Sequence, residues 1–174
     1  MSIATNSHIV VDIVDDLNTP LHVAASIGLL EFTKEIINRN PEAALCINRQ
    51  GLTPLHLACA CGHLAVVREL LRLRCGPELC RVPDKNGLLA IHTAAANGEL
   101  GVVKEVMRDC EGWMRERTRE GDSILHLAVQ SENFEVIRFL VEELSDDHEI
   151  LGSKDADGNT ILHLAAARKQ VEVI

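Results

Sequence analysis

One four-residue motif recurs five times along this chain of 174 residues. Each copy ends in histidine, and the copies begin at residues 19, 53, 89, 123 and 160, so they recur every 34 to 37 residues. They read Thr-Pro-Leu-His twice, then Leu-Ala-Ile-His, Ser-Ile-Leu-His and Thr-Ile-Leu-His. A period of this length is typical of helix pairs that stack into a solenoid. The sequence therefore predicts an all-α solenoid that offers a stacked surface, and it shows no motif for a reaction.

The second copy shows how one repeat folds. Gly51 gives freedom for a turn, Thr53 is a natural N-cap, and Pro54 suits the first helical position, where its missing N–H costs nothing. Gly62 then ends the short helix. Apolar residues within 64–71 recur at helical spacing and predict a second amphipathic helix. A hairpin-like finger is expected to lead into the next copy.

These motifs resemble the ankyrin repeat, whose pattern is a finger with glycine, then Thr-Pro-Leu-His-x-Ala-Ala, Gly-His and Val-Val-x-x-Leu-Leu. The resemblance covers about residues 15–174 and implies that 1–174 form one ankyrin-repeat domain. The repeats are expected at about 14–47, 48–83, 84–117 and 118–154, with a truncated fifth at 155–174. Since that copy stops where its second helix would begin, we expect the chain to be a fragment of a longer protein or its last residues to fray.

Several positions depart from the family pattern. Leu17 stands where the first finger should have glycine, so that finger is expected to be malformed or to join a capping segment at 9–14. Leu89 replaces the hydroxyl N-cap of the third copy, and Glu132 and Lys169 replace the helix-ending glycine of the fourth and fifth. We expect each lost cap to weaken its layer by about 1 kcal/mol.

Two segments, 40–45 and 154–170, are similar to plant ankyrin proteins with a membrane-associated carboxy-terminal region, the ankyrin–transmembrane or PGG-domain proteins. This resemblance implies a cytoplasmic module, at the cytosolic face of a membrane in the full-length protein, that acts in plant defence or stress signalling. Two alternatives stay open. In the first, the module regulates a membrane channel or transporter-like segment that lies outside these residues. In the second, it is the targeting domain of an enzyme whose catalytic domain lies outside them.

Composition narrows the possible partners. The formal net charge of −9 argues against nucleic acid, because phosphate binding needs a basic surface. No uncharged apolar run approaches the roughly 20 residues of a membrane span, so this part is expected not to insert into a membrane. The sequence has neither a nucleophile-elbow nor a P-loop pattern. We therefore expect a protein or peptide partner, no cofactor and no intrinsic catalysis.

The six cysteines are expected to be reduced structural thiols in a cytosolic protein. Cys59 occupies the position of an alanine in other copies and is expected to be a small buried residue. Cys75 and Cys80 lie in a loop without a second cysteine pair or a histidine pair at zinc-finger spacing.

The five motif histidines have a structural and a functional interpretation. Stacked layers place equivalent atoms about 8–10 Å apart, whereas the ligands of one zinc ion each lie about 2 Å from the metal. We therefore expect each imidazole to form hydrogen bonds that join neighbouring fingers, and no metal site. These residues are His22, His56, His92, His126 and His163.

Partner-binding residues are expected on the fingers and on the inner helices. Arg49, Lys85 and Arg119 occupy the same finger position and should form a basic row, which we call the rail, suited to an acidic or phosphorylated partner. Arg115, Arg117 and Arg119 occupy alternate positions, so in an extended finger strand they share one side and should thicken the rail at the fourth copy. Ordinary solubilising charge is the competing interpretation of the rail. The inner-helix candidates are Ile27, Ala60, Cys61, Asn97 and Gln130.

The only tryptophan, Trp113, lies between the third and fourth copies. It is either an interface anchor or a loop residue that packs against the third layer.

Overall fold

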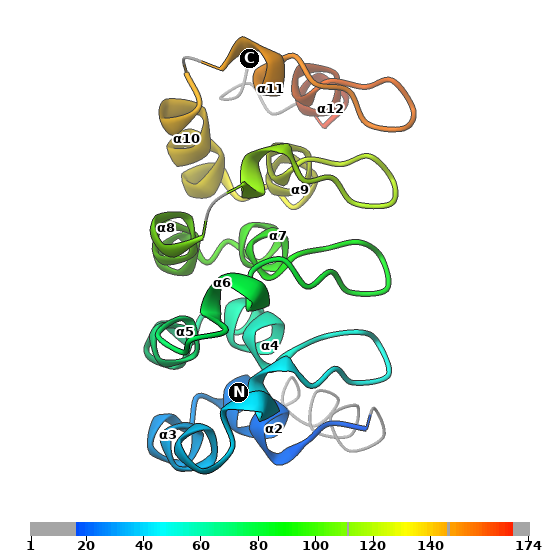
Figure 1. Cartoon of the computed structure of the whole chain (residues 1–174). Coiled ribbons are helices and arrows are strands. Elements are labelled where there is room, and N and C mark those ends of the chain that lie inside the picture. Colours follow the sequence, from blue (N-terminus) through cyan, green and yellow to red (C-terminus); the bar gives the residue numbers. More distant parts are fainter. Residues whose placement is uncertain (1–16, 111, 146, 169–174) are drawn as a thin grey trace, which may run out of the picture.

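The computed structural model describes residues 17–110, 112–145 and 147–168, which contain eleven α-helices, two short 3₁₀ helices and no strand. The helices form two parallel columns, and all fingers project to one side (Figure 1). The inner column consists of α2 (Pro20–Ile27), α4 (Pro54–Ala60), α7 (Ala90–Ala96), α9 (Ile124–Gln130) and α12 (Ile161–Ala167). The outer column consists of α3 (Leu30–Arg39), α5 (Leu64–Leu71), α8 (Leu100–Asp109) and α10 (Phe134–Glu143).

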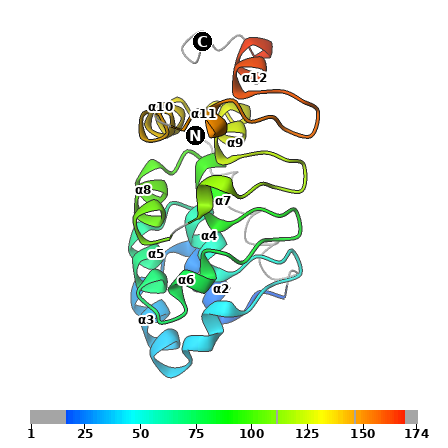
Figure 2. The same cartoon turned by 45° about the horizontal axis from the view of Figure 1, so that its top comes forward.

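Short helices occupy the connections between successive layers. A layer is numbered here by its inner helix, so layers one to five contain α2, α4, α7, α9 and α12. The connecting helices are η1 (Pro41–Leu45), α6 (Gly76–Leu79), η2 (Trp113–Arg115) and α11 (His148–Leu151). The tilted view shows the layers stacked in chain order (Figure 2). The predicted all-α solenoid is confirmed.

The inner helices begin as the motif predicts. Thr19, Thr53 and Ser123 each accept a hydrogen bond from the backbone N–H three residues later, which satisfies one orphan donor of the first turn. Leu89 has no such side-chain cap at the start of α7. The predicted loss of the hydroxyl cap in layer three is therefore confirmed.

Small and aliphatic residues fill the space between layers. Ala25, Ala58 and Ala95 have no exposed surface, and neither does Cys59. Burial raises the pKa of the Cys59 thiol, as for an inert interior cysteine. Thin layers have little room for large rings, which explains why the chain contains only four aromatic side chains of the Phe and Trp types.

The fingers are turns of five residues at 48–52, 84–88, 118–122 and 155–159. The last three are each joined to the preceding finger by a backbone hydrogen bond, from Lys85 N to Gln50 O (3.0 Å), from Arg119 N to Asn86 O and from Ala156 N to Glu120 O. The finger glycine has a left-handed backbone, and a Cβ on Gly51 would lie 3.0 Å from Lys85 N. Glycine is therefore required here both by the turn and by the approach of the next finger.

Among the residues that the structure describes, two non-glycine residues adopt the left-handed conformation, Leu17 (φ 56°) and Glu132 (φ 58°). Leu17 thus takes the backbone conformation of the glycine that it replaces, while the predicted capping segment at 9–14 lies outside the described residues. Glu132 stands at the end of α9, where layers one to three have Gly28, Gly62 and Gly98. Lys169, the corresponding residue of layer five, also lies outside the described residues.

We expect Glu132→Gly to stabilise the protein by about 0.5–1 kcal/mol, because glycine removes the strain that a left-handed backbone imposes on a residue with a Cβ. This net value already allows for the larger conformational entropy that glycine loses on folding. The urea midpoint, followed by circular dichroism, measures this. Arg138→Gly, in the exposed interior of α10, is the control and should destabilise by about 1 kcal/mol. A lower midpoint for Glu132→Gly would contradict the strain argument.

Charged contacts join neighbouring outer helices. The carboxylate of Glu105 in α8, which is only 5% exposed, accepts from Arg68 of α5 at 2.9 Å and from Arg108 of its own helix. These hydrogen bonds, led by that from Arg68, lower the pKa of Glu105. The Lys104 ammonium of α8 lies 4.7 Å from the centre of the Phe139 ring of α10, which links layers three and four.

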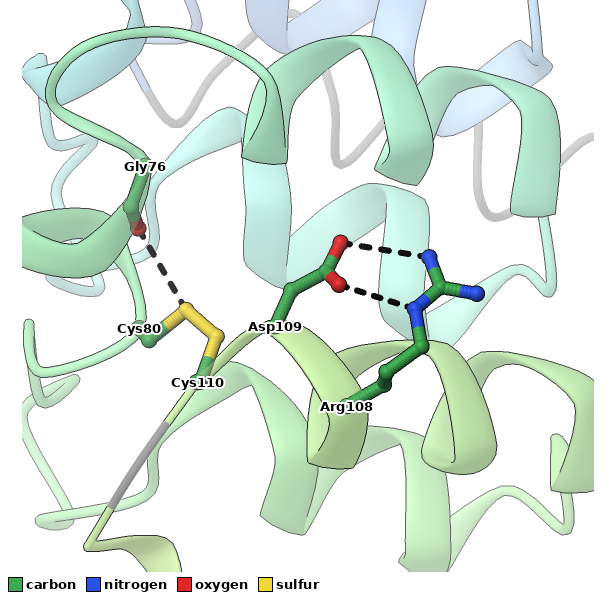
Figure 3. The surroundings of a disulfide bond; sticks show 5 residues. All are labelled: Gly76, Cys80, Arg108, Asp109 and Cys110. Atoms are coloured by element: carbon green, nitrogen blue, oxygen red, sulfur yellow. Dashed lines mark hydrogen bonds and ion pairs between the residues drawn. A yellow bond between two sulfur atoms is a disulfide. The ribbon is translucent and has the colours of Figure 1, made fainter.

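A disulfide joins Cys80 to Cys110, whose Cα atoms are 6.1 Å apart (Figure 3). Cys80 follows α6 and Cys110 follows α8, so the bridge connects the loops on either side of layer three. The Cys80 sulfur also lies 3.3 Å from the carbonyl oxygen of Gly76. The expectation that all six cysteines are free thiols is therefore wrong for this pair, because the fold brings together two loops that are 30 residues apart.

Candidate protein-binding surface

The motif histidines hold each layer to the finger that follows it. In layer two, His56 Nδ1 accepts from the backbone N–H of Thr53 at 3.1 Å, so the neutral ring has its proton on Nε2. Nε2 then donates to the Leu88 carbonyl of the next finger at 3.1 Å. His22 donates in the same way to Leu52, and His126 to Asn159. The prediction that these imidazoles join neighbouring layers is confirmed for these three residues.

His92 lacks the bond to the following finger. Its Nδ1 accepts from Leu89 N at 3.1 Å, but its Nε2 is buried without a hydrogen-bond partner among the described residues. Burial, together with the nearby Arg117 guanidinium, lowers the pKa of His92 to about 4. The equivalent acceptor would be the carbonyl of Asp122, in finger four. The histidine hydrogen bond is therefore missing between layers three and four, where the Asn133 amide donates to the Ala95 and Ala96 carbonyls.

Finger four is also built differently from its neighbours. Asp84 opens finger three, and its carboxylate accepts the N–H groups of Asn86 and Leu88, both at 2.8 Å. Thr118 opens finger four, and its hydroxyl accepts one N–H, that of Asp122 at 3.1 Å. Thr118 thus replaces the Asn or Asp that opens the other fingers, and its side chain is shorter. This replacement lies at the layer boundary where His92 lacks its acceptor.

The three rail residues lie on successive finger tips, and all are exposed. Backbone hydrogen bonds between the fingers keep Arg49, Lys85 and Arg119 in equivalent positions along the stack. The expected thickening of the rail at finger four is wrong. Arg115 belongs to η2 rather than to an extended strand, and Arg117 has its Nη1 atom buried.

The inner-helix candidates lie at the carboxyl ends of successive helices. Ile27 is 51% exposed, and Cys61 and Asn97 are exposed too, whereas Ala60 is half-buried. Asn97 uses its side-chain amide to donate to the Thr93 carbonyl at 2.8 Å. Gln130 is half-buried and donates to the Asp122 carboxylate at 3.0 Å. Leu29 and Phe32 of layer one are also apolar and nearly half exposed.

Two of the candidate residues, Arg119 and Gln130, line one pocket of about 390 Å³ between fingers three and four and helix α9. The pocket has a mixed lining of apolar, amide and charged side chains. Its other lining residues are Asn86, Leu88, Thr118, Glu120, Asp122 and Leu127. The remaining candidates do not line it.

Sequence reasoning missed Asp122, which is only 5% exposed and reaches the pocket between the fingers. The signal was present in the register of the fingers. Leu52, Leu88 and Asn159 occupy the same finger position in the other copies, so a carboxylate there stands out.

Trp113 begins η2, in the connection between layers three and four, and packs against the core. It is 6% exposed and lines, with Cys80, Cys110 and Val106, a second cavity of about 270 Å³. The interpretation as a loop residue that packs against the third layer is confirmed.

Neither metal-binding nor membrane-spanning features occur in the part of the chain that the structure describes. No group of three or more His, Cys, Asp or Glu residues in this part is placed to hold a metal ion. No helix in the same residues combines the length and apolar character needed to cross a bilayer.

Comparison with known proteins agrees with the geometry. A family model described as ankyrin repeats in three copies matches residues 3–82, 73–150 and 91–174. A curated relative, the ankyrin repeat domain-containing protein SAT10 of the fungus Stachybotrys chartarum, is 50% identical over 62 residues. That match covers 33% of this chain and 3% of the relative, so the chain spans a small part of that protein's length.

Proposed function

Because the chain belongs to the ankyrin-repeat family, whose domains are generally non-catalytic and bind proteins, we propose that it is a protein-binding module without enzymatic activity. One observation supports this most strongly: regularly spaced finger tips and inner-helix ends form a continuous exposed row on a stack held by buried hydrogen bonds. A surface ordered before binding lowers the entropic cost of recognition.

The charge of the rail determines which chemical class of partner we propose. Arg49, Lys85 and Arg119 are exposed cations on a chain whose formal net charge is −9. None of the three takes part in an ion pair among the described residues, although other arginines of the chain do. Unpaired cations in a row favour a segment that carries carboxylates or phosphates. Apolar side chains of that segment would lie toward Ile27, Ala60 and Cys61.

The triple variant Arg49→Glu, Lys85→Glu, Arg119→Glu tests the rail. We expect partner affinity to fall at least about tenfold, and the salt dependence of binding to flatten, because each reversal replaces attraction with repulsion. Affinity capture with wild-type protein identifies the partner, and calorimetry at two salt concentrations measures the loss.

A matched variant reverses three exposed arginines away from the fingers, Arg39→Glu, Arg74→Glu and Arg138→Glu. It has the same net charge as the rail variant and should bind as wild type does. Equal losses in both variants would mean that overall charge, and not the rail, governs binding.

A finer proposal concerns the cellular setting. The resemblance of segments 40–45 and 154–170 to plant PGG-domain proteins supports a cytosolic ankyrin module of a membrane-tethered defence or stress-signalling protein. The alternatives are the regulatory domain of a channel or transporter-like segment, or the targeting domain of an enzyme. The reading frame beyond Ile174 decides among them: apolar spans of about 20 residues favour the membrane proposals, whereas catalytic motifs favour the last.

A further inference from the structure

Asp122 places a carboxylate where stacking does not require one. The same finger position holds Leu52, Leu88 and Asn159 in neighbouring copies, and those fingers stack through backbone groups. Burying a carboxylate costs free energy unless it is well partnered. The side-chain donor that reaches Asp122 among the described residues is the neutral amide of Gln130, at 3.0 Å. Burial raises the pKa of Asp122, which reflects this incomplete compensation.

The charges around Asp122 favour the binding of a cationic group. Glu120 lines the same pocket, and the carboxylates of Glu120 and Asp155 are both close enough to act on Asp122. The basic groups beside it are the Arg119 guanidinium at the pocket lining and the His126 imidazole, which engages Asn159 of finger five. The pocket lining therefore holds two carboxylates, those of Asp122 and Glu120, and one guanidinium, and the carboxylate of Asp155 acts on Asp122 from outside the lining.

The rest of the lining matches a long basic side chain. Leu88 and Leu127 offer apolar surface on which an aliphatic stem can pack, while Asn86 and Gln130 add side-chain amides, which carry acceptor oxygens, to the lining. A guanidinium or ammonium group needs this combination of a carboxylate with neutral acceptors.

We propose that the pocket between fingers three and four receives an arginine or lysine side chain of the protein partner, with its cation on the carboxylate of Asp122. The partner as the source of that side chain rests on the proposed function, whereas the chemistry of the pocket does not. Together with the rail, this site selects a segment of mixed charge, with acidic groups along the finger tips and one basic residue inserted between them.

The test uses argininamide as the probe and nuclear magnetic resonance of the Gln130 side-chain amide and the Asp122 backbone amide as the readout. We expect saturable shifts of both signals in wild-type protein, with a dissociation constant on the order of millimolar for one side chain. Citrullinamide, which has the same shape without the charge, should bind at least about tenfold more weakly.

Asp122→Asn keeps the shape of the side chain and removes the charge, so we expect at least about a fivefold loss of argininamide affinity. Asp157→Asn removes one carboxylate from the exposed tip of finger five and should leave the affinity unchanged. Equal shifts with citrullinamide, or no shift of the Gln130 amide with argininamide, would overturn the pocket proposal even if every variant failed to fold. Those results would leave the rail experiment, and with it the proposed function, standing.

Discussion

Loss of the disulfide between Cys80 and Cys110 is expected to lower the free energy of unfolding by about 3–4 kcal/mol. The bridge closes a loop of 30 residues, and most of its effect comes from restricting the unfolded chain. Cys80→Ser with Cys110→Ser, compared with wild type in urea without reductant, measures the difference. Both residues are buried, so part of the loss will come from packing.

The control is Cys46→Ser with Cys61→Ser, which replaces two exposed free cysteines and should change stability by less than about 0.5 kcal/mol. Thiol titration of the denatured wild-type protein should find four free thiols before reduction and six after it. Six thiols before reduction would contradict the bridge itself. Trp113 lines the same cavity as the two cysteines, so its fluorescence reports reduction of the disulfide.

The second large expected effect is a loss of stability in mild acid. The pKa of His92 is about 4 in the folded protein against 6.5 in the unfolded chain, so between these values the unfolded state binds more protons. As far as His92 is concerned, the free energy of unfolding is therefore at its full value above pH 6.5 and falls as the pH drops toward 4. A difference of this size corresponds to about 3 kcal/mol. Burial lowers the pKa of His22 and His56 as well, which adds to the loss.

Urea unfolding at pH 7.5, 6, 5 and 4 measures this dependence. His92→Leu removes the titrating ring and the unpaired Nε2 donor while keeping an apolar side chain of similar volume. We expect its stability to fall less steeply over the same range, since His22 and His56 remain. A variant with the wild-type pH dependence would show that His92 is not the source.

The repeat period explains how much of the structure could be predicted. Residues in phase with it have the same surroundings in every layer, so the N-cap of Thr53, the contact of His56 with the next finger and the turn at Gly51 follow from the pattern. The basic row of finger tips follows from the same register, and its role in binding stays a prediction.

The features that sequence analysis missed lie where the period fails. The loops that contain Cys80 and Cys110 have no equivalent in the motif, so their approach depends on the tertiary path around layer three. The pattern places Arg115 beside Arg117 and Arg119 on an extended strand, but Arg115 belongs to η2 instead. Asp122 is a departure from the pattern whose burial depends on how finger four packs against α9.

The direction of the histidine hydrogen bonds gives the molecule a mechanical polarity. Each donor ring belongs to one layer, and its acceptor carbonyl belongs to the finger of the next layer. Detaching layer five therefore leaves the His126 ring of the remaining stack without its acceptor. Detaching layer one leaves only the Leu52 carbonyl of the remaining stack without its donor. At His92 no such bond resists separation. Separating layer three from layer four therefore breaks the two hydrogen bonds that the Asn133 amide donates to the Ala95 and Ala96 carbonyls, in place of a histidine bond.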